Sequence, residues 1–416
     1  MSLFGKKKEG STKTIVIVDI GSGSVGCALA QLDRSGPPAL LAQVRVDVAL
    51  DAARSGEKIA DAALKSAKEA MAPIAAKARA NAAALALSKD SPKDVRIDHV
   101  AVFLPAPWSS LFLRNIRLAR DIPIQIDPEL VERMVDDYVK RERPDTDREE
   151  VIERSAVGIR LNGYSVADVP KQAVASVIEL SIVSATAPKE MLAELRALIQ
   201  EVFGHHVPIT FHATSVAAAY ALSVVMPNTP DYIFCNSEGE VTELLLTLEH
   251  VPSGVATATV GCNTILRTLS AHADMARVEA SSALTLAKNE RSPMNQKLSK
   301  TLTTAGKECS EGFRTAAAEL VKTAAAARTI YIAGNGPSAT WYADAVARAP
   351  FLKTLFPSGV SVEAVTYSTL SKFVKNTETT STAGAKTNDA FLALEAIYAD
   401  ARFDERRGLN FKAGNI

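Results

Sequence analysis

Short apolar runs alternate along the chain with alanine-rich or amphipathic stretches. Ile97–Leu104, Val177–Thr186 and Thr329–Ala333 are predominantly apolar and of strand length, which is typical of buried strands. Ser55–Leu87 is rich in alanine with charged residues interspersed, and this pattern predicts a helix with a potential break at Pro73. The alternation of strands and helices indicates an α/β architecture.

Capping residues place several helix boundaries. Asp127–Arg141 should be a helix, with Asp127 as its N-cap and a proline in its first position. Pro188–Phe203 predicts an amphipathic helix that ends at Gly204. Arg141–Arg154 is dense in charge and predicts a solvated loop or a helix end. Two further helices are expected, over Thr214–Val225 and Asn263–Lys288.

The first candidate site is a polar turn between two apolar runs in Ile15–Ala30, IVIVDIGSGSVGCALA. The turn holds Gly21, Ser22, Gly23 and Ser24. Its glycines allow close approach of the backbone to a ligand, and its N–H and hydroxyl groups can hold an anion. Asp19 ends the first apolar run, where its carboxylate could face a metal ion or the water shell of that ion. The alternative is an ordinary hairpin with a polar turn.

The better-known nucleotide motifs do not fit this turn. A Walker loop needs a lysine after its last glycine, and none follows here. Gly21, Gly23 and Gly26 satisfy the letters of G-x-G-x-x-G, but no acidic residue ends a clear second strand about 20 residues further on. The turn therefore matches neither motif, and both an anion site and an ordinary hairpin stay open.

The same plan recurs in the second half of the chain. An apolar strand, Tyr232–Cys235, is followed by a polar turn, Asn236–Val241, and by a second strand, Leu244–Leu248. A third turn follows Ile330–Ala333 and places Gly334, Asn335 and Gly336 before a helix. Three such turns in this order are more specific than any one of them.

This order of turns resembles the actin-like ATPase superfamily, which has a duplicated, ribonuclease-H-like fold. The resemblance implies two lobes that each offer a hairpin to the phosphates of ATP, while the third turn meets the adenosine. Within the superfamily, DPELVERMVDDYVKRE and the segment VGIRLNGYSVADVPKQAVASVIELSIVSATAPKEML resemble the small α+β insertion of the FtsA/PilM family. ITFHATSVAAAYAL, PSGVATATVGCNTILRTL and AKTNDAFLALEAIYA resemble later segments of that family. The resemblance extends from about Thr14 to Tyr398.

The resemblance implies a division of the chain. Residues 1–13 are expected to be a disordered basic tail and 401–416 a second tail. The first lobe should comprise 14–108 and 182–228, with the inserted subdomain at 109–181. The second lobe should comprise 229–384, and 385–400 should be a helix that closes on the first lobe.

Carried over by position, the resemblance predicts a site for ATP and Mg²⁺, with Asp19 as the metal contact. The predicted nucleotide-binding residues are Asp19, Gly21, Ser22, Gly23, Ser24, Gly239, Thr242, Glu279, Gly334, Asn335 and Gly336.

Three residues depart from the family pattern: Asn236 stands where the family has an aspartate, Glu238 where it has a glycine, and Ser282 where it has a lysine. An amide lacks the charge that favours hydrated Mg²⁺. No catalytic residue is therefore assigned, and the chain is expected to be at most a weak ATPase. Either Glu238 turns away from the phosphates or nucleotide binding is weakened.

Composition narrows the classes of partner. Lysine plus arginine equals aspartate plus glutamate, 47 residues each, so no net charge favours nucleic acid. The four cysteines lie far apart in the sequence and suggest a reducing compartment. No apolar run approaches the about 20 residues of a membrane-spanning helix. A cytoplasmic protein is expected, either free or peripheral at the inner face of the membrane.

The resemblance implies a protein that self-associates and recruits membrane or cytoskeletal partners. An FtsZ-type partner would place it in cell division, and a PilN-type partner in type IV pilus assembly. One alternative is a scaffold that keeps the fold without using nucleotide. A small-molecule kinase of the same fold is less well supported, because no acceptor-binding cluster with a catalytic base is evident.

Overall fold

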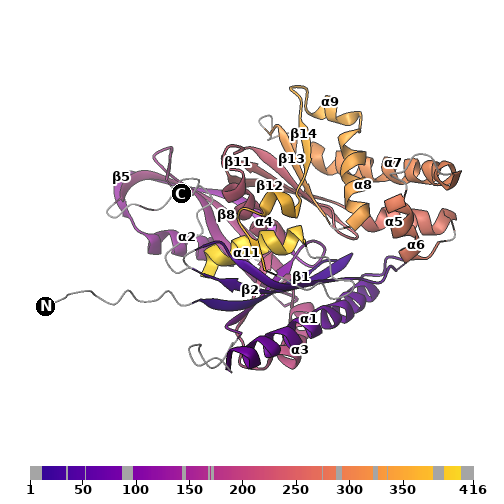
Figure 1. Ribbon diagram of the computed structural model, residues 1–416. Helices are drawn as coiled ribbons and strands as arrows, with labels where there is room; N and C mark the ends of the chain where they lie inside the picture. The colour runs from indigo at the N-terminus through magenta and orange to yellow at the C-terminus, as the bar shows by residue number, and fades with distance from the viewer. Residues whose placement is uncertain are drawn as a thin grey trace.

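The computed structural model describes residues 12–33, 36–51, 53–86, 97–142, 147–166, 169, 173–273, 275–286, 293–321, 327–334, 336–377 and 388–403 (Figure 1). The predicted basic tail up to residue 11, the predicted tail beyond residue 403 and Asn335 lie outside these residues.

The first lobe is built on a six-stranded sheet in the order β15-β3-β2-β1-β4-β9. Its strands are β1 (Lys13–Ile20), β2 (Ser24–Leu32), β3 (Ala39–Asp47), β4 (His99–Leu104), β9 (Ile209–Ala213) and β15 (Lys375–Asn376). β1 pairs antiparallel with β2 and parallel with β4. The short turn between β1 and β2 therefore lies at the edge of the sheet where the parallel strands end.

The second lobe repeats this plan in a five-stranded sheet, ordered β12-β11-β10-β13-β14. Its strands are β10 (Tyr232–Asn236), β11 (Thr242–Leu248), β12 (Val251–Ala258), β13 (Thr329–Ala333) and β14 (Ser361–Ala364). β10 pairs antiparallel with β11 and parallel with β13, as β1 does with β2 and β4. This repetition and the arrangement of layers confirm the expected α/β fold with two related lobes.

Two helices, α4 (Thr214–Val225) and α11 (Ala390–Phe403), pack in the core between the two sheets. The alternation of side chains along β1 decides which face they cover: Ile15 and Ile17 pack in this central core, whereas Val16 and Val18 face α1 (Gly56–Ala86) and α3 (Lys189–Phe203). Figure 1 shows α1 and α3 on the outer side of the first lobe.

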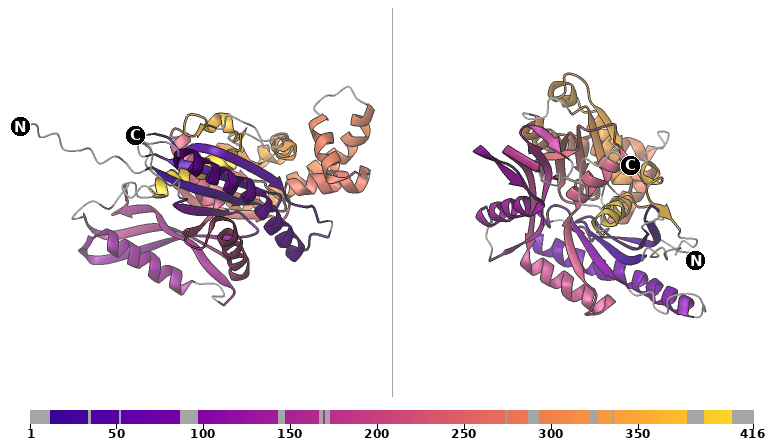
Figure 2. Two further views of the ribbon diagram at one scale, coloured as in Figure 1. Left: turned by 60° about the horizontal axis from the view of Figure 1, so that its bottom comes forward. Right: turned by 90° about the vertical axis from the view of Figure 1, so that its left-hand side faces the viewer.

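The second lobe is completed by helices on its outer face. They are α5 (Cys262–Ala273), α6 (Arg277–Leu286), α7 (Pro293–Val321), α8 (Gly336–Ala347) and α9 (Phe351–Leu355), whereas α10 (Tyr367–Leu370) packs against α11 in the central core. Side chains of α5, α7 and α8 share a core with Ile233 and Cys235 of β10. α6 and the first part of α7 project beyond the sheets (Figure 2, left), whereas the last part of α7 packs against β12.

A third, four-stranded sheet, ordered β5-β8-β6-β7, lies between β4 and α3 in the chain. It contains β5 (Ser110–Ile126), β6 (Glu149–Leu161), β7 (Tyr164–Val166) and β8 (Ala173–Pro188), and α2 (Pro128–Arg141) covers one face. The sheet has its own apolar core beneath α2 and stands beside the two lobes (Figure 2, right). β8 continues to Pro188, past residue 181, where the insertion was expected to end.

Several local predictions are confirmed. Asp127 caps α2, because its side chain accepts a hydrogen bond from the backbone N–H of Leu130 at 2.7 Å. Gly204, with φ of 103°, follows the last residue of α3. α4 has the predicted bounds.

Three local predictions are wrong. α1 continues through Pro73, which lies on the exposed side of the helix, where the carbonyl left without a donor can face water. Arg141–Arg154 is not only loop and helix end, because β6 begins at Glu149. Asn263–Lys288 contains two helices, α5 and α6, rather than one.

Candidate functional site: the two turns between the lobes

The turn after β1 and the turn after β10 touch each other. The backbone N–H of Glu240 donates a hydrogen bond to Ser22 Oγ at 2.9 Å. A Cβ atom added at Gly23 would lie 2.8 Å from Cα of Gly239, and one added at Gly239 would lie 2.2 Å from Ser22 Oγ. Gly239 also has a φ of +60°, which glycine adopts without strain. Glycine is therefore required on both sides of this contact.

Glu238 points into the first turn rather than away from it. Its Oε1 accepts a hydrogen bond from Ser24 Oγ at 3.0 Å. A Cβ atom at Gly21 would lie 2.0 Å from Glu238 Oε2, so the carboxylate lies directly against the backbone of that glycine. Glu238 therefore does not turn away from the first turn, and weakened nucleotide binding stays a prediction.

Arg45 of β3 gathers the carboxylates around this turn. Its Nη2 donates to Asp19 Oδ2 at 2.7 Å, and its Nε donates to Asp389, the residue before α11. Arg45 Nη1 lies 3.5 Å from Glu238 Oε1 and donates to Ser24 Oγ at 3.0 Å. The side chains of Arg45, Asp19 and Asp389 are each 1% exposed. One buried guanidinium thus joins β1, the second turn and α11.

The cluster contains more carboxyl groups than guanidinium groups. Glu395 of α11 is 1% exposed, and in the described part of the chain neither of its carboxyl oxygens has a hydrogen-bond partner. Burial raises the pKa of Glu395 well above 4.5, and the negative charge of Asp19 raises it further. Burial also raises the pKa of Asp19 from 3.8 to about 7; Arg45 opposes this shift, while Glu238 and Asp389 add to it. Burial disfavours the charge of Arg45, but Asp389, Asp19 and Glu238 outweigh burial and raise its pKa.

The raised pKa of Asp19 predicts a pH dependence of stability. Between pH 3.8, the ordinary pKa, and about 7, the folded state holds a proton that the unfolded chain has released, so the free energy of unfolding should fall as the pH rises. The slope from this one group approaches about 1.4 kcal/mol per pH unit. Urea denaturation from pH 4 to 8 checks it: Asp19→Asn should lose this part of the slope, and an identical slope in the variant would contradict the assignment.

Glu240 lies in a second ionic cluster on the other side of the turn. Its Oε1 accepts from Asn263 Nδ2 at 2.8 Å and from Arg267 Nη2 at 2.6 Å, both on α5. Its Oε2 accepts from Nε of Arg54, which follows β3 in the first lobe, at 3.1 Å. Arg54 also donates to the backbone carbonyl of Thr259 at 2.7 Å. The two lobes are therefore joined through both glutamates of the second turn.

The remaining predicted residues have local partners. Asn236 is 3% exposed, and its Oδ1 accepts from the backbone N–H of Glu238 at 3.2 Å. Thr242 Oγ1 donates to the Tyr342 hydroxyl at 3.0 Å. Glu279 is exposed, and its side chain accepts a hydrogen bond from the backbone N–H of Ala276. Glu279 thereby caps the N-terminus of the helix in which it lies, α6.

The third turn reaches the same region. A Cβ at Gly334 would lie 3.0 Å from the Ser237 hydroxyl, so this turn packs against the second. Gly336 begins α8. Among the described residues, the structure therefore brings together the first two turns and Gly334 of the third, whereas the Glu279 side chain caps its own helix.

The fold family implies ATP and Mg²⁺ between the turns, and these residues do not fit that pair. The Ser22 and Ser24 hydroxyls and one Asp19 oxygen are used within the protein, and Glu238 lies where a ligand would approach Gly21. Among the described residues, no group of three or more histidine, cysteine, aspartate and glutamate side chains is arranged to hold a metal ion.

Sequence reasoning missed Arg45, Asp389 and Glu395. A weak signal existed for each: Arg45 interrupts the strand ALLAQVRVD, and Glu395 interrupts the apolar run AFLALEAIYA. Asp389 precedes that run as an N-cap, and its Oδ1 accepts from the N–H groups of the second and third helical residues at 3.0 and 3.1 Å. None of these patterns indicates which residues Arg45, Asp389 and Glu395 contact in the fold, because those residues are distant in the sequence.

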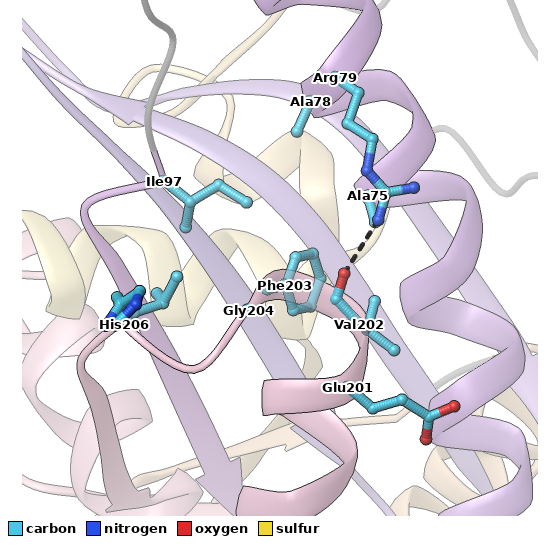
Figure 3. A pocket seen from close by; sticks show the side chains of 10 residues that line it. Ala75, Ala78, Arg79, Ile97, Glu201, Val202, Phe203, Gly204 and His206 are labelled. Atoms are coloured by element: carbon cyan, nitrogen blue, oxygen red, sulfur yellow. Dashed lines mark hydrogen bonds between the residues drawn. The ribbon is translucent and has the colours of Figure 1, made fainter.

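A cavity of 740 Å³ lies elsewhere, between α1, α3 and the start of β4 (Figure 3). Its lining includes Ala75, Ala78, Ile97 and Phe203, and Arg79 at its edge donates to the carbonyl of Val202 at 3.1 Å. Ile97 precedes β4, whereas the turns follow the carboxyl ends of the parallel strands. The cavity is therefore at the opposite edge of the first sheet and shares no residue with the turns.

In the described residues no helix is long and apolar enough to cross a membrane. No protein-family model and no curated protein sequence matches the chain.

Solved structures are similar to the chain to different degrees. A "PilM-PilN type IV pilus biogenesis complex" is 16% identical, with 92% of this chain and 97% of that chain covered and a TM-score of 0.55. Ethanolamine utilization protein EutJ from Carboxydothermus hydrogenoformans is 12% identical, with 85% of each chain covered and a TM-score of 0.41. Component A of (R)-2-hydroxyglutaryl-CoA dehydratase from Acidaminococcus fermentans is 10% identical over 92% of this chain and 99% of that chain, with a TM-score of 0.35. The PilM match confirms the expected resemblance at the level of the fold.

Proposed function

We propose that this chain is an actin-fold assembly protein that works as a scaffold without needing nucleotide. It would act in the cytoplasm at the inner face of the membrane, binding a PilN-type partner in type IV pilus assembly. The observation that carries the proposal is the fold match to the PilM–PilN complex, which spans nearly the whole of both chains. An FtsZ-type partner, and so a role in cell division, is the competing assignment.

A second candidate is an assembly protein driven by ATP binding, with little or no hydrolysis. It would need a groove between the two turns that can admit phosphates. The contact between Gly23 and Gly239 and the position of Glu238 favour the scaffold instead.

The partner assignment is tested by co-purification of the immobilised protein with the PilN-type and FtsZ-type proteins of the same cell. We expect the PilN-type protein to be retained, and to the same extent with and without ATP–Mg²⁺. Retention of the FtsZ-type protein alone would contradict the pilus assignment. Retention that depends on ATP–Mg²⁺ would contradict the scaffold and favour the second candidate.

Self-association is the other expected property of such a scaffold. Two-lobed subunits that pack head to tail form filaments when the rotation between neighbours does not close. Sedimentation velocity over a wide range of protein concentrations should show a rising weight-average sedimentation coefficient, unchanged by ATP–Mg²⁺. A monomer at every concentration would count against the assembly role.

A further inference from the structure

The second turn carries two glutamates on either side of Gly239, and both are buried. Glu238 is 5% exposed and Glu240 is 4% exposed. Burying a carboxylate is costly unless it is paired and hydrogen-bonded, so two of them on one short turn demand compensation. That compensation comes largely from arginines.

The ion pairs cross from one lobe to the other. Glu238 reaches Arg45 on β3 of the first lobe, at 3.5 Å. Glu240 reaches Arg54, which follows β3, at 3.1 Å, and Arg267 on α5 of its own lobe at 2.6 Å. Arg267 in turn donates to the backbone carbonyl of Asp51 in the first lobe at 3.2 Å. Each carboxylate is thus part of a bridge between the lobes.

Arginine recognises carboxylates and phosphates by the same planar array of N–H donors. A glutamate can therefore satisfy an arginine that would otherwise hold a phosphate. The Glu–Gly–Glu turn offers two anions to three arginines, Arg45, Arg54 and Arg267, at the contact between the two lobes.

We propose that Glu238 and Glu240 act as built-in anionic ligands that hold the lobes closed and take the place of a bound nucleotide in this chain. The inference rests on the scaffold function proposed above, but it concerns the lobes alone and needs no partner. Glu238 fills the first turn, and Glu240 forms ion pairs with the two arginines beside it. An incoming phosphate would have to separate the turns and approach both carboxylates.

One consequence is that removing Glu240 should expose an anion site. Without its carboxylate, Arg54 and Arg267 would face each other across the space it leaves. Pyrophosphate, used as the probe, should then bind to Glu240→Ala and raise its melting temperature in a saturable way. The natural protein and the exposed-site control Glu363→Ala should show no such rise. A rise of equal size in the natural protein, or none in Glu240→Ala, would overturn the proposal.

The closure itself is tested by the distance between the lobes. Lys58 on α1 and Lys353 on α9 are exposed and lie in different lobes, so each can be changed to cysteine and spin-labelled, while Cys27, Cys235, Cys262 and Cys309 are buried. In the natural background we expect one narrow distance distribution that ATP–Mg²⁺ leaves unchanged. In Glu238→Gln/Glu240→Gln, which keeps the size of both side chains, we expect a broader distribution with longer distances.

A broad distribution in the natural background that narrows on addition of ATP–Mg²⁺ would overturn the proposal. So would an unchanged distribution in the double variant. If the double variant does not fold, the single variant Glu240→Gln carries the same test. Failure here leaves the partner assignment standing, because co-purification is measured separately.

Discussion

Replacing Arg45 with methionine should destabilise the protein by about 3 to 5 kcal/mol at neutral pH. Methionine fills a similar volume but leaves Asp19, Glu238 and Asp389 without the cation that they surround. Carboxylates that stay buried without a partner either lower the stability of the folded state, because they have lost their hydration, or take up protons. The loss should therefore shrink as the pH falls, because protonated carboxyls need no cation.

Urea denaturation measures this effect, and Arg348→Met is the matched control. Arg348 forms an ion pair with Asp344 at 3.6 Å, but its side chain is 82% exposed. Removing such a surface pair should cost less than about 1 kcal/mol. Equal losses in the two variants would mean that the Arg45 cluster does not hold the first lobe to the second turn and α11.

Gly239→Ala should have the second large effect, a loss of about 2 to 4 kcal/mol. Part of the cost is the φ of +60°, which an alanine adopts only with strain. The larger part is that the new Cβ would lie 2.4 Å from the backbone nitrogen of Gly23, so the turns would have to separate. The variant should therefore lose both stability against unfolding and the close contact between the first and second turns.

Gly359→Ala separates these two causes. Gly359 has a φ of +85° and nothing within 4 Å of an added Cβ, so only the backbone strain remains. We expect a loss of about 1 kcal/mol there, measured by the same denaturation. A loss at Gly239 no greater than that at Gly359 would show that the two turns are not pressed together in solution.

Local signals in the sequence predict local structure well. The N-cap at Asp127, the glycine after α3 and the polar turn after β1 each depend on neighbours within a few residues, and all are found where the sequence places them. The repeated order of strands in the two sheets follows from the same strand–turn–strand pattern occurring twice.

Contacts between residues that are far apart in the sequence could not be predicted. Glu153 lies in a segment dense in charge, and such a segment ordinarily faces solvent. In the fold it is a buried residue of β6, because its carboxylate meets the His212 ring at 3.1 Å and the Tyr398 hydroxyl at 3.1 Å. Neither partner is near it in the sequence.

The altered second turn shows the same limit. Asn236 and Glu238 could be recognised as departures from the family pattern, and a charge near phosphate could be foreseen. That Glu238 would reach Arg45, and Glu240 would reach Arg54, could not be foreseen. The identity of each partner depends on how the two lobes meet in space, and residues of both lobes that are far apart in the sequence take part in that contact.

The most direct test of the central claim is a calorimetric titration of ATP–Mg²⁺ into the natural protein at neutral pH. If the chain's own carboxylates hold the lobes closed, millimolar ATP–Mg²⁺ should give no heat beyond that of dilution. Saturable binding with a dissociation constant in the micromolar range, with Glu238 and Glu240 unchanged, would contradict the account.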